Sequence, residues 1–178
     1  MSRLTSSHLT SDPLLTAARL VVIFMMVMLV IGVTAIGIGI PIVFAWRAQV
    51  LAELAADNAP AITLWAIIAV MALIAGGLML GYRFLQQLLR IVASVGEGDP
   101  FIPANAQRLQ HMGWLVLVIQ IVAIPAGALA AWISTVTEKV ETDVGFSANG
   151  LVLMLILFIL ARVFRKGTEM RAELEGTV

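Results

Sequence analysis

Residues 82–112 have the sequence YRFLQQLLRIVASVGEGDPFIPANAQRLQHM, and this stretch decides the architecture of the chain. It is the long polar interruption in a sequence of apolar runs, with two such runs before it and two after it. It carries Arg83, Arg90 and Arg108, and its middle, GEGDPF, is rich in turn-forming residues. We interpret it as the main cytoplasmic segment of a chain that crosses a bilayer four times.

The composition supports a membrane protein. Of the 178 residues, 61% are hydrophobic and 12% are charged, with a mean hydropathy of +1.01. In a soluble domain, roughly half of the residues are hydrophobic and roughly a quarter are charged. The chain has no cysteine, which excludes disulfides, thiolate metal sites and a cysteine nucleophile.

The predicted fold is an all-α integral membrane protein, with four transmembrane helices in an antiparallel bundle and cytoplasmic amphipathic helical extensions. A flexible cytoplasmic tail, residues 1–12, precedes a four-span membrane domain, residues 13–165. The predicted spans are long enough for a hydrocarbon core of about 30 Å and cover about residues 17–46, 60–82, 113–134 and 147–164. The first run is too long for a signal peptide, so we expect a retained anchor.

Residues 83–112 form the predicted cytoplasmic loop. The second helix is expected to continue into it, because apolar residues recur at helical spacing at Leu85, Leu88, Leu89, Val92 and Val95. This extension should lie along the lipid headgroups or pack on the bundle. Gly96 and Gly98 should end the helix, and Pro103 or Asn105 should begin the next one.

Residues 166–178 are predicted to form a cytoplasmic C-terminal helix. Val163, Gly167, Met170 and Leu174 fall on one side of it. Three interpretations stay open: this helix docks a partner, lies on the membrane surface, or covers the protein's own cytoplasmic turn.

Basic residues predict the orientation of the chain. With both termini and residues 83–112 in the cytoplasm, most of the 11 Lys and Arg residues lie inside, and only Arg47 and Lys139 lie outside. The nine on the inside are Arg3, Arg19, Arg83, Arg90, Arg108, Arg162, Arg165, Lys166 and Arg171. The expected orientation therefore places both termini and residues 83–112 in the cytoplasm.

The sequence offers no constellation of catalytic or metal-binding residues. No acid or base lies deep in a span, the usual mark of an ion relay. We expect Gln120, inside the third span, to have a structural role and bond to a neighbouring helix or to a carbonyl freed by Pro125, with a ligand contact as the alternative. The predicted outer loop is acidic through Glu138, Glu141 and Asp143, which topology explains more simply than a cation site. We predict no enzyme activity, no cofactor and no metal.

Two groups of residues resemble a known family. They are Gly98-Asp99-Pro100-Phe101, followed by Asn105, Arg108-Leu109 and Gly113-Trp114, and the ending from Ala161 through Phe164, Gly167 and Glu173 to Thr177-Val178. Together they resemble the bacterial membrane family catalogued as domain of unknown function 2975. The resemblance implies a four-span inner-membrane protein, often encoded beside a small helix-turn-helix regulator. It carries over no catalytic residue.

The leading functional hypothesis is a membrane-bound regulatory partner of a small helix-turn-helix transcription factor, without direct contact to nucleic acid. The predicted contact residues lie in the turn and on the closing helix: Asp99, Phe101, Asn105, Arg108, Phe164, Met170 and Leu174. The structural alternative is that these residues cap helices, meet lipid phosphate or plug the inner end of the bundle. The functional alternative is a small transporter or channel subunit acting as a homo-oligomer, with Gln120 and Thr34 lining its path.

Overall fold

A computed structural model describes residues 13–137 and 147–175. All regular structure in these two ranges is helical, in five helices: α1 (Pro13–Ala45), α2 (Arg47–Ala56), α3 (Thr63–Gly96), α4 (Pro103–Thr137) and α5 (Ala148–Glu175). Four of them, α1, α3, α4 and α5, are long and apolar enough to cross a membrane. The chain is therefore an all-helical membrane protein over the ranges described.

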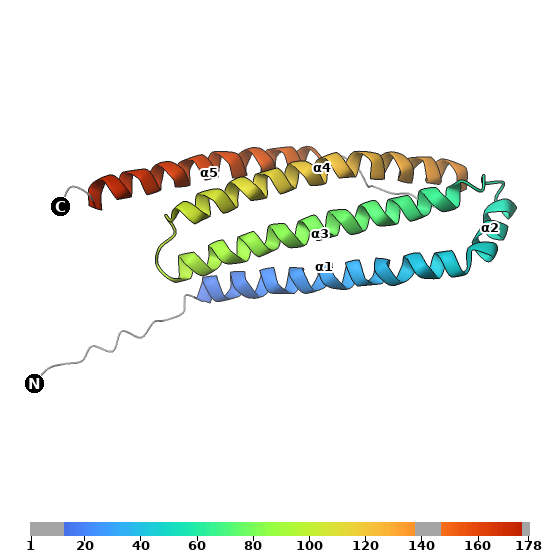
Figure 1. Cartoon of the computed structure of the whole chain (residues 1–178), viewed down its shortest axis with the longest axis horizontal. Coiled ribbons are helices and arrows are strands. Elements are labelled where there is room, and N and C mark those ends of the chain that lie inside the picture. Colours follow the sequence, from blue (N-terminus) through green and yellow to red (C-terminus); the bar gives the residue numbers. More distant parts are fainter. Residues whose placement is uncertain (1–12, 138–146, 176–178) are drawn as a thin grey trace, which may run out of the picture.

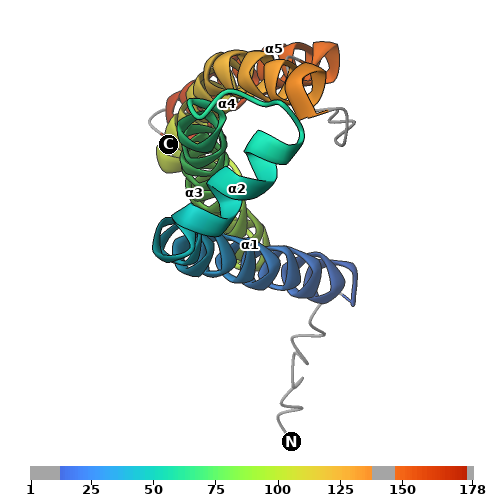
Figure 2. The same cartoon turned by 90° about the vertical axis from the view of Figure 1, so that its right-hand side faces the viewer.

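The four long helices lie side by side in chain order and form an open, curved layer (Figures 1 and 2). Each long helix makes its main contacts with the long helix before or after it in the chain: α1 with α3, α3 with α4, and α4 with α5. The start of α1, the α3–α4 connection and the end of α5 lie at one end of the layer, which we call the turn end (Figure 1). The short helix α2 lies across the opposite end, the α2 end (Figure 2).

The helix continues through residues 83–96 as the spacing predicted, because α3 runs as one helix of 34 residues to Gly96. Leu85 is buried, and Leu88 packs against the core cluster between α4 and α5. The extension thus packs on the neighbouring helices. Gly98 follows with a φ of +86°, a left-handed conformation that glycine adopts without steric cost.

The core of the turn end lies between α4 and α5. Its buried members are Leu109, Met112, Val116, Leu157 and Ala161. Phe84, Leu88, Ile91, Met154 and Phe164 pack around them. Residues of α3, α4 and α5 therefore meet in one cluster, which fixes where the α3–α4 turn stands relative to α5.

Small residues of α1 lie close to α3. A Cβ atom on Gly39 would lie 3.0 Å from Met71 Cε, and one on Gly32 would lie 3.2 Å from Leu78 Cδ1. Elsewhere α1 is largely exposed, with Val22 as its buried residue. Exposed apolar side chains suit a helix that faces lipid.

The structure moves one predicted helix start and decides between the two predicted for another. The second span was expected to begin at residue 60, but α3 begins at Thr63, whose N–H donates to the Pro60 carbonyl at 2.9 Å. Pro60 thus belongs to the preceding turn. The third long helix begins at Pro103, the first of the two predicted starts, and Asn105 lies inside it.

The polar residue inside the third span joins two helices, as expected. Gln120 is 7% exposed, and its Nε2 donates to the Ser147 carbonyl, just before α5, at 2.6 Å. A Cβ atom on Gly150 would lie only 2.5 Å from Gln120 Cδ, so the glycine leaves room for this amide. Gln120 therefore links the middle of α4 to the start of α5.

Several predictions fall outside the described residues. They concern the tail at residues 1–12, the acidic loop with Glu138, Glu141 and Asp143, and the closing Thr177-Val178.

Candidate functional site at the turn between α3 and α4

The α3–α4 turn lies against the second half of α5. Five of the seven predicted contact residues meet here, together with Gly167 and Arg171. We call this group the turn–tail junction: Asp99, Phe101, Asn105, Arg108, Phe164, Gly167 and Arg171. The turn and the closing helix, which carry the predicted contact residues, are therefore in contact.

Asn105 holds the turn from inside. Its side chain is fully buried, and its Nδ2 donates to Ser94 Oγ at 2.7 Å and to the Pro100 carbonyl at 2.9 Å. Its Oδ1 accepts a hydrogen bond from Arg108 Nη1 at 2.8 Å. Both amide protons and the carbonyl oxygen are thus used, which is how a buried amide avoids a desolvation cost. Asn105 does not cap α4, contrary to the structural alternative given above.

Arg108 joins α4 to α3. Besides its bond to Asn105, its Nη1 lies 3.3 Å from the Arg90 carbonyl near the end of α3. A guanidinium group with several donors can satisfy both acceptors from one helix. Arg108 therefore fixes the angle at which α3 approaches the turn.

Two phenylalanines connect the turn with α5. The ring centroids of Phe101 and Phe164 lie 5.2 Å apart with an interplanar angle of 36°. Gly167 lies one turn after Phe164, and a Cβ atom there would be 2.9 Å from Phe101 Cδ1. The absence of a side chain at Gly167 lets the Phe101 ring lie directly against the α5 backbone.

An ion pair closes the junction. Arg171 Nη1 of α5 donates to Asp99 Oδ1 of the turn, which is 72 residues away in the sequence. The two side chains are 50% and 42% exposed, so solvent screens their attraction. Exposed pairs contribute about 0.2–1 kcal/mol, so this contact holds the turn to α5 only weakly.

The two remaining predicted residues, Met170 and Leu174, lie on α5 with 51% and 72% of their surface exposed. On the predicted apolar side of the closing helix, only Gly167 of the four named residues contacts the turn in the part of the chain that the structure describes. Phe164, Gly167 and Arg171 contact the turn, whereas Val163, Met170 and Leu174 stay exposed. Of the three interpretations of this helix, covering the protein's own turn agrees with these contacts.

Sequence reasoning missed two members of the junction, Gly167 and Arg171, and also missed Ser94, which bonds to Asn105. Ser94 is buried and links Asn105 to the Ile91 carbonyl, to which its hydroxyl donates at 2.8 Å. Gly167 had a signal in the sequence, since a glycine one turn after Phe164 allows a ring to approach the helix. Arg171 had no signal in the sequence, because its pairing with Asp99 depends on the orientation of α5 relative to the turn.

The residues of the turn–tail junction suit contact with another molecule better than metal binding. Within residues 13–137 and 147–175, no group of three His, Asp or Glu side chains is placed to hold a metal ion. What the junction does offer is a buried amide network under an exposed ion pair and a ring pair, with exposed apolar residues beside them. Such an arrangement can position two segments together and present them to another molecule.

A family model described as "Protein of unknown function (DUF2975)" matches residues 46–178. The matched range contains α2 to α5 and the whole turn–tail junction. No curated protein and no solved structure matches the chain.

Proposed function

This chain belongs to the DUF2975 family, and we propose that it is a membrane-bound regulatory partner that holds a small helix-turn-helix transcription factor at its turn–tail junction. The proposal includes a bacterial inner-membrane location, antiparallel spans and cytoplasmic termini, with α3 and α5 extending into the cytoplasm. The partner binds DNA, and this chain does not.

The observation that carries the proposal is the meeting of the turn and α5. A surface shared by two segments far apart in the sequence needs contacts that hold them together. The Asp99–Arg171 ion pair and the Phe101–Phe164 ring pair are such contacts.

Exposed apolar residues beside the junction support a protein partner. Phe101 is 43% exposed, and Met170 and Leu174 are more so. In water, apolar surface gains about 25 cal/mol for each Å² that a partner covers. Large side chains of this kind are common anchors of helix-in-groove and helix-on-helix recognition.

The charge distribution supports the cytoplasmic placement of this end. Arg83, Arg90 and Arg108 precede or follow the turn, and α5 carries a further four basic residues beyond its apolar run, at 162, 165, 166 and 171. Basic residues next to spans stay in the cytoplasm during insertion.

Site-specific photo-cross-linking in the native host tests the proposal. A cross-linking residue at Met170 should capture a small helix-turn-helix protein, identified by mass spectrometry. The matched control is Ile62, which is 64% exposed just before α3 at the α2 end and should not capture it. The proposal fails if position 170 captures no DNA-binding protein, or if position 62 captures the same one.

No observation favours the transporter alternative. Gln120 lies in a packed environment against Ser147 and Gly150. Thr34 lines a different cavity, of about 930 Å³ along α1 and α3, and its hydroxyl donates to the Val30 carbonyl of its own helix. The two polar residues proposed for a path therefore do not share one.

A further inference from the structure

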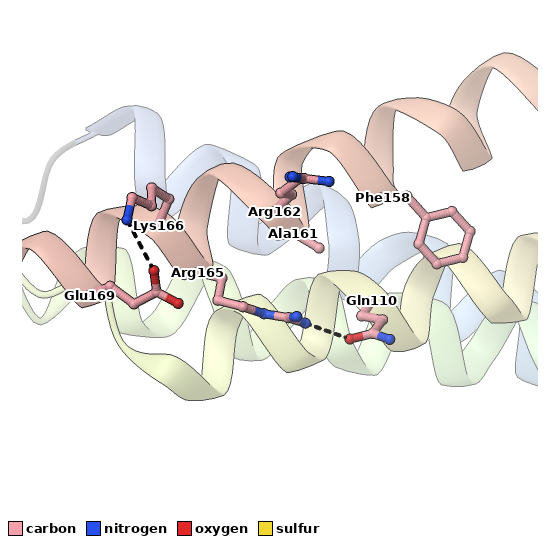
Figure 3. A pocket seen from close by; sticks show the side chains of 7 residues that line it. All are labelled: Gln110, Phe158, Ala161, Arg162, Arg165, Lys166 and Glu169. Carbon is pink, nitrogen blue, oxygen red and sulfur yellow. Dashed lines mark hydrogen bonds and ion pairs between the residues drawn. The ribbon is translucent and has the colours of Figure 1, made fainter.

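A cavity of about 620 Å³ opens between α4 and α5, away from the turn–tail junction contacts. Gln110 of α4 and six residues of α5 line it: Phe158, Ala161, Arg162, Arg165, Lys166 and Glu169 (Figure 3). Three of these carry a positive charge and one carries a negative charge. The cavity therefore has a net positive lining.

The positive charges are only partly balanced. Lys166 Nζ lies 3.4 Å from Glu169 Oε2, an exposed pair that contributes little. Arg165 Nη2 donates to the neutral Gln110 Oε1 at 2.9 Å (Figure 3), a bond that points its guanidinium across the cavity towards α4. The Arg162 side chain makes no hydrogen bond or ion pair with any residue in the described ranges. Among residues 13–137 and 147–175, neither Arg162 nor Arg165 therefore has a carboxylate partner.

The cavity lies where apolar sequence gives way to charge. Arg162 is the first charged residue after the apolar run 151–161 of α5, so it stands at the boundary between hydrocarbon and headgroups. Phe158 and Ala161 line the apolar side, and Trp114 of α4 packs edge-on against Phe158 with ring centroids 5.6 Å apart. Tryptophan is enriched at this depth of a membrane.

An amphiphile with a negatively charged head and an apolar tail matches this arrangement. Its phosphate would meet Arg162 and Arg165, and its acyl chain would lie along Phe158. Basic pockets between membrane helices bind anionic lipid headgroups by this combination of charge and depth. A guanidinium group also suits phosphate, because its donors can bind two oxygens together.

We propose that the cavity between α4 and α5 binds the phosphate of an anionic phospholipid. Arg162 and Arg165 bind the phosphate oxygens, Lys166 adds positive charge, and Gln110 holds Arg165 in position. The inference needs only the membrane placement of the helices and is independent of the proposed transcription factor.

Fluorescence quenching by brominated lipids tests it on the full chain. Replacing Trp46, Trp65 and Trp132 by Phe leaves Trp114 as the reporter beside the cavity. In bilayers that contain dibrominated phosphatidylglycerol or dibrominated phosphatidylcholine, Trp114 should be quenched more strongly by the anionic lipid. Arg162→Gln should lower the relative binding constant for phosphatidylglycerol about fivefold, the effect of one basic residue near a membrane surface.

The control is Arg83→Gln, which removes one exposed arginine from α3 outside this cavity and should leave the preference unchanged. Arg162→Gln/Arg165→Gln should remove most of the preference that remains. Equal quenching by the two lipids in the unmodified cavity would overturn the proposal, as would equal losses in the Arg162 and Arg83 variants. Loss of the preference when inorganic phosphate replaces chloride at equal ionic strength would assign the cavity to a soluble phosphate instead.

Discussion

Replacing Asn105 by Ala should loosen the α3–α4 turn while the four long helices stay folded. The substitution removes three hydrogen bonds, to Ser94 Oγ, the Pro100 carbonyl and Arg108 Nη1. Ser94 keeps its bond to the Ile91 carbonyl, and Arg108 keeps its contact with the Arg90 carbonyl. The Pro100 carbonyl is therefore the group that the change affects most.

The magnitude follows from these bonds. A hydrogen bond in a protein contributes about 0.5–1.5 kcal/mol, so three of them amount to roughly 3 kcal/mol of local stability at the turn. A free-energy loss of that size corresponds to an opening of the turn on the order of 100-fold more frequent. Because Asn105 is fully buried, a small cavity adds to the loss.

Hydrogen exchange measured by mass spectrometry on the purified chain is the suitable assay. The backbone N–H of Asp99 donates to the Ser94 carbonyl at 3.2 Å and should lose most of its protection in the variant. Asn149→Ala, at an exposed asparagine near the start of α5, serves as the control and should leave this amide unchanged. A change of less than about threefold at Asp99, or an equal change in the control, would refute the role of Asn105.

Two glycine substitutions test the close approaches. Gly167→Ala places a Cβ atom 2.9 Å from Phe101 Cδ1, whereas Gly76→Ala meets nothing within 4 Å and gains about 1 kcal/mol of helix propensity. Thermal unfolding should find Gly167→Ala less stable than Gly76→Ala by about 1–3 kcal/mol, and equal stabilities would contradict the packing of Phe101 on α5. Gly150→Ala should likewise destabilise by about 1–3 kcal/mol, because its Cβ collides with Gln120. The loss should disappear in a Gln120→Ala background, and an unchanged loss there would show that the collision is not its cause.

Much of the fold could be predicted from the sequence because membrane insertion leaves strong local signals. Long apolar runs indicated four helices, and the helical spacing of Leu85 and Leu88 predicted that α3 continues beyond its span. Gly96 and Gly98 marked the end of that helix. These features depend on neighbours in the sequence, so they can be recognised without knowing the tertiary structure.

Which residues of α5 contact the α3–α4 turn was harder to predict. A helical pattern placed Met170 and Leu174 on one side of α5, but it could not tell whether that side or the side of Phe164 faces the turn. The orientation of α5 depends on its core contacts, such as Leu157 and Ala161 against α4. A rotation of the helix by roughly 75° would bring Met170 and Leu174 to the turn in place of Phe164 and Arg171, and no local signal encodes that rotation.

The helix layer can stay open because lipid surrounds its apolar spans, whereas polar bonds hold its turn end. Apolar side chains that face lipid lose little by being exposed to it, so among the long helices α1 can pack mainly on α3 without a closed bundle. At the turn end, α3, α4 and α5 extend beyond the apolar runs, and there the chain is held by specific polar bonds such as those of Asn105 and Arg165. Because these bonds are local to that end, the contacts of the turn with α5 can open while the membrane helices stay paired. A molecule that binds the exposed side of α5 could therefore shift the turn at the cost of a few weak contacts, above all the Asp99–Arg171 ion pair.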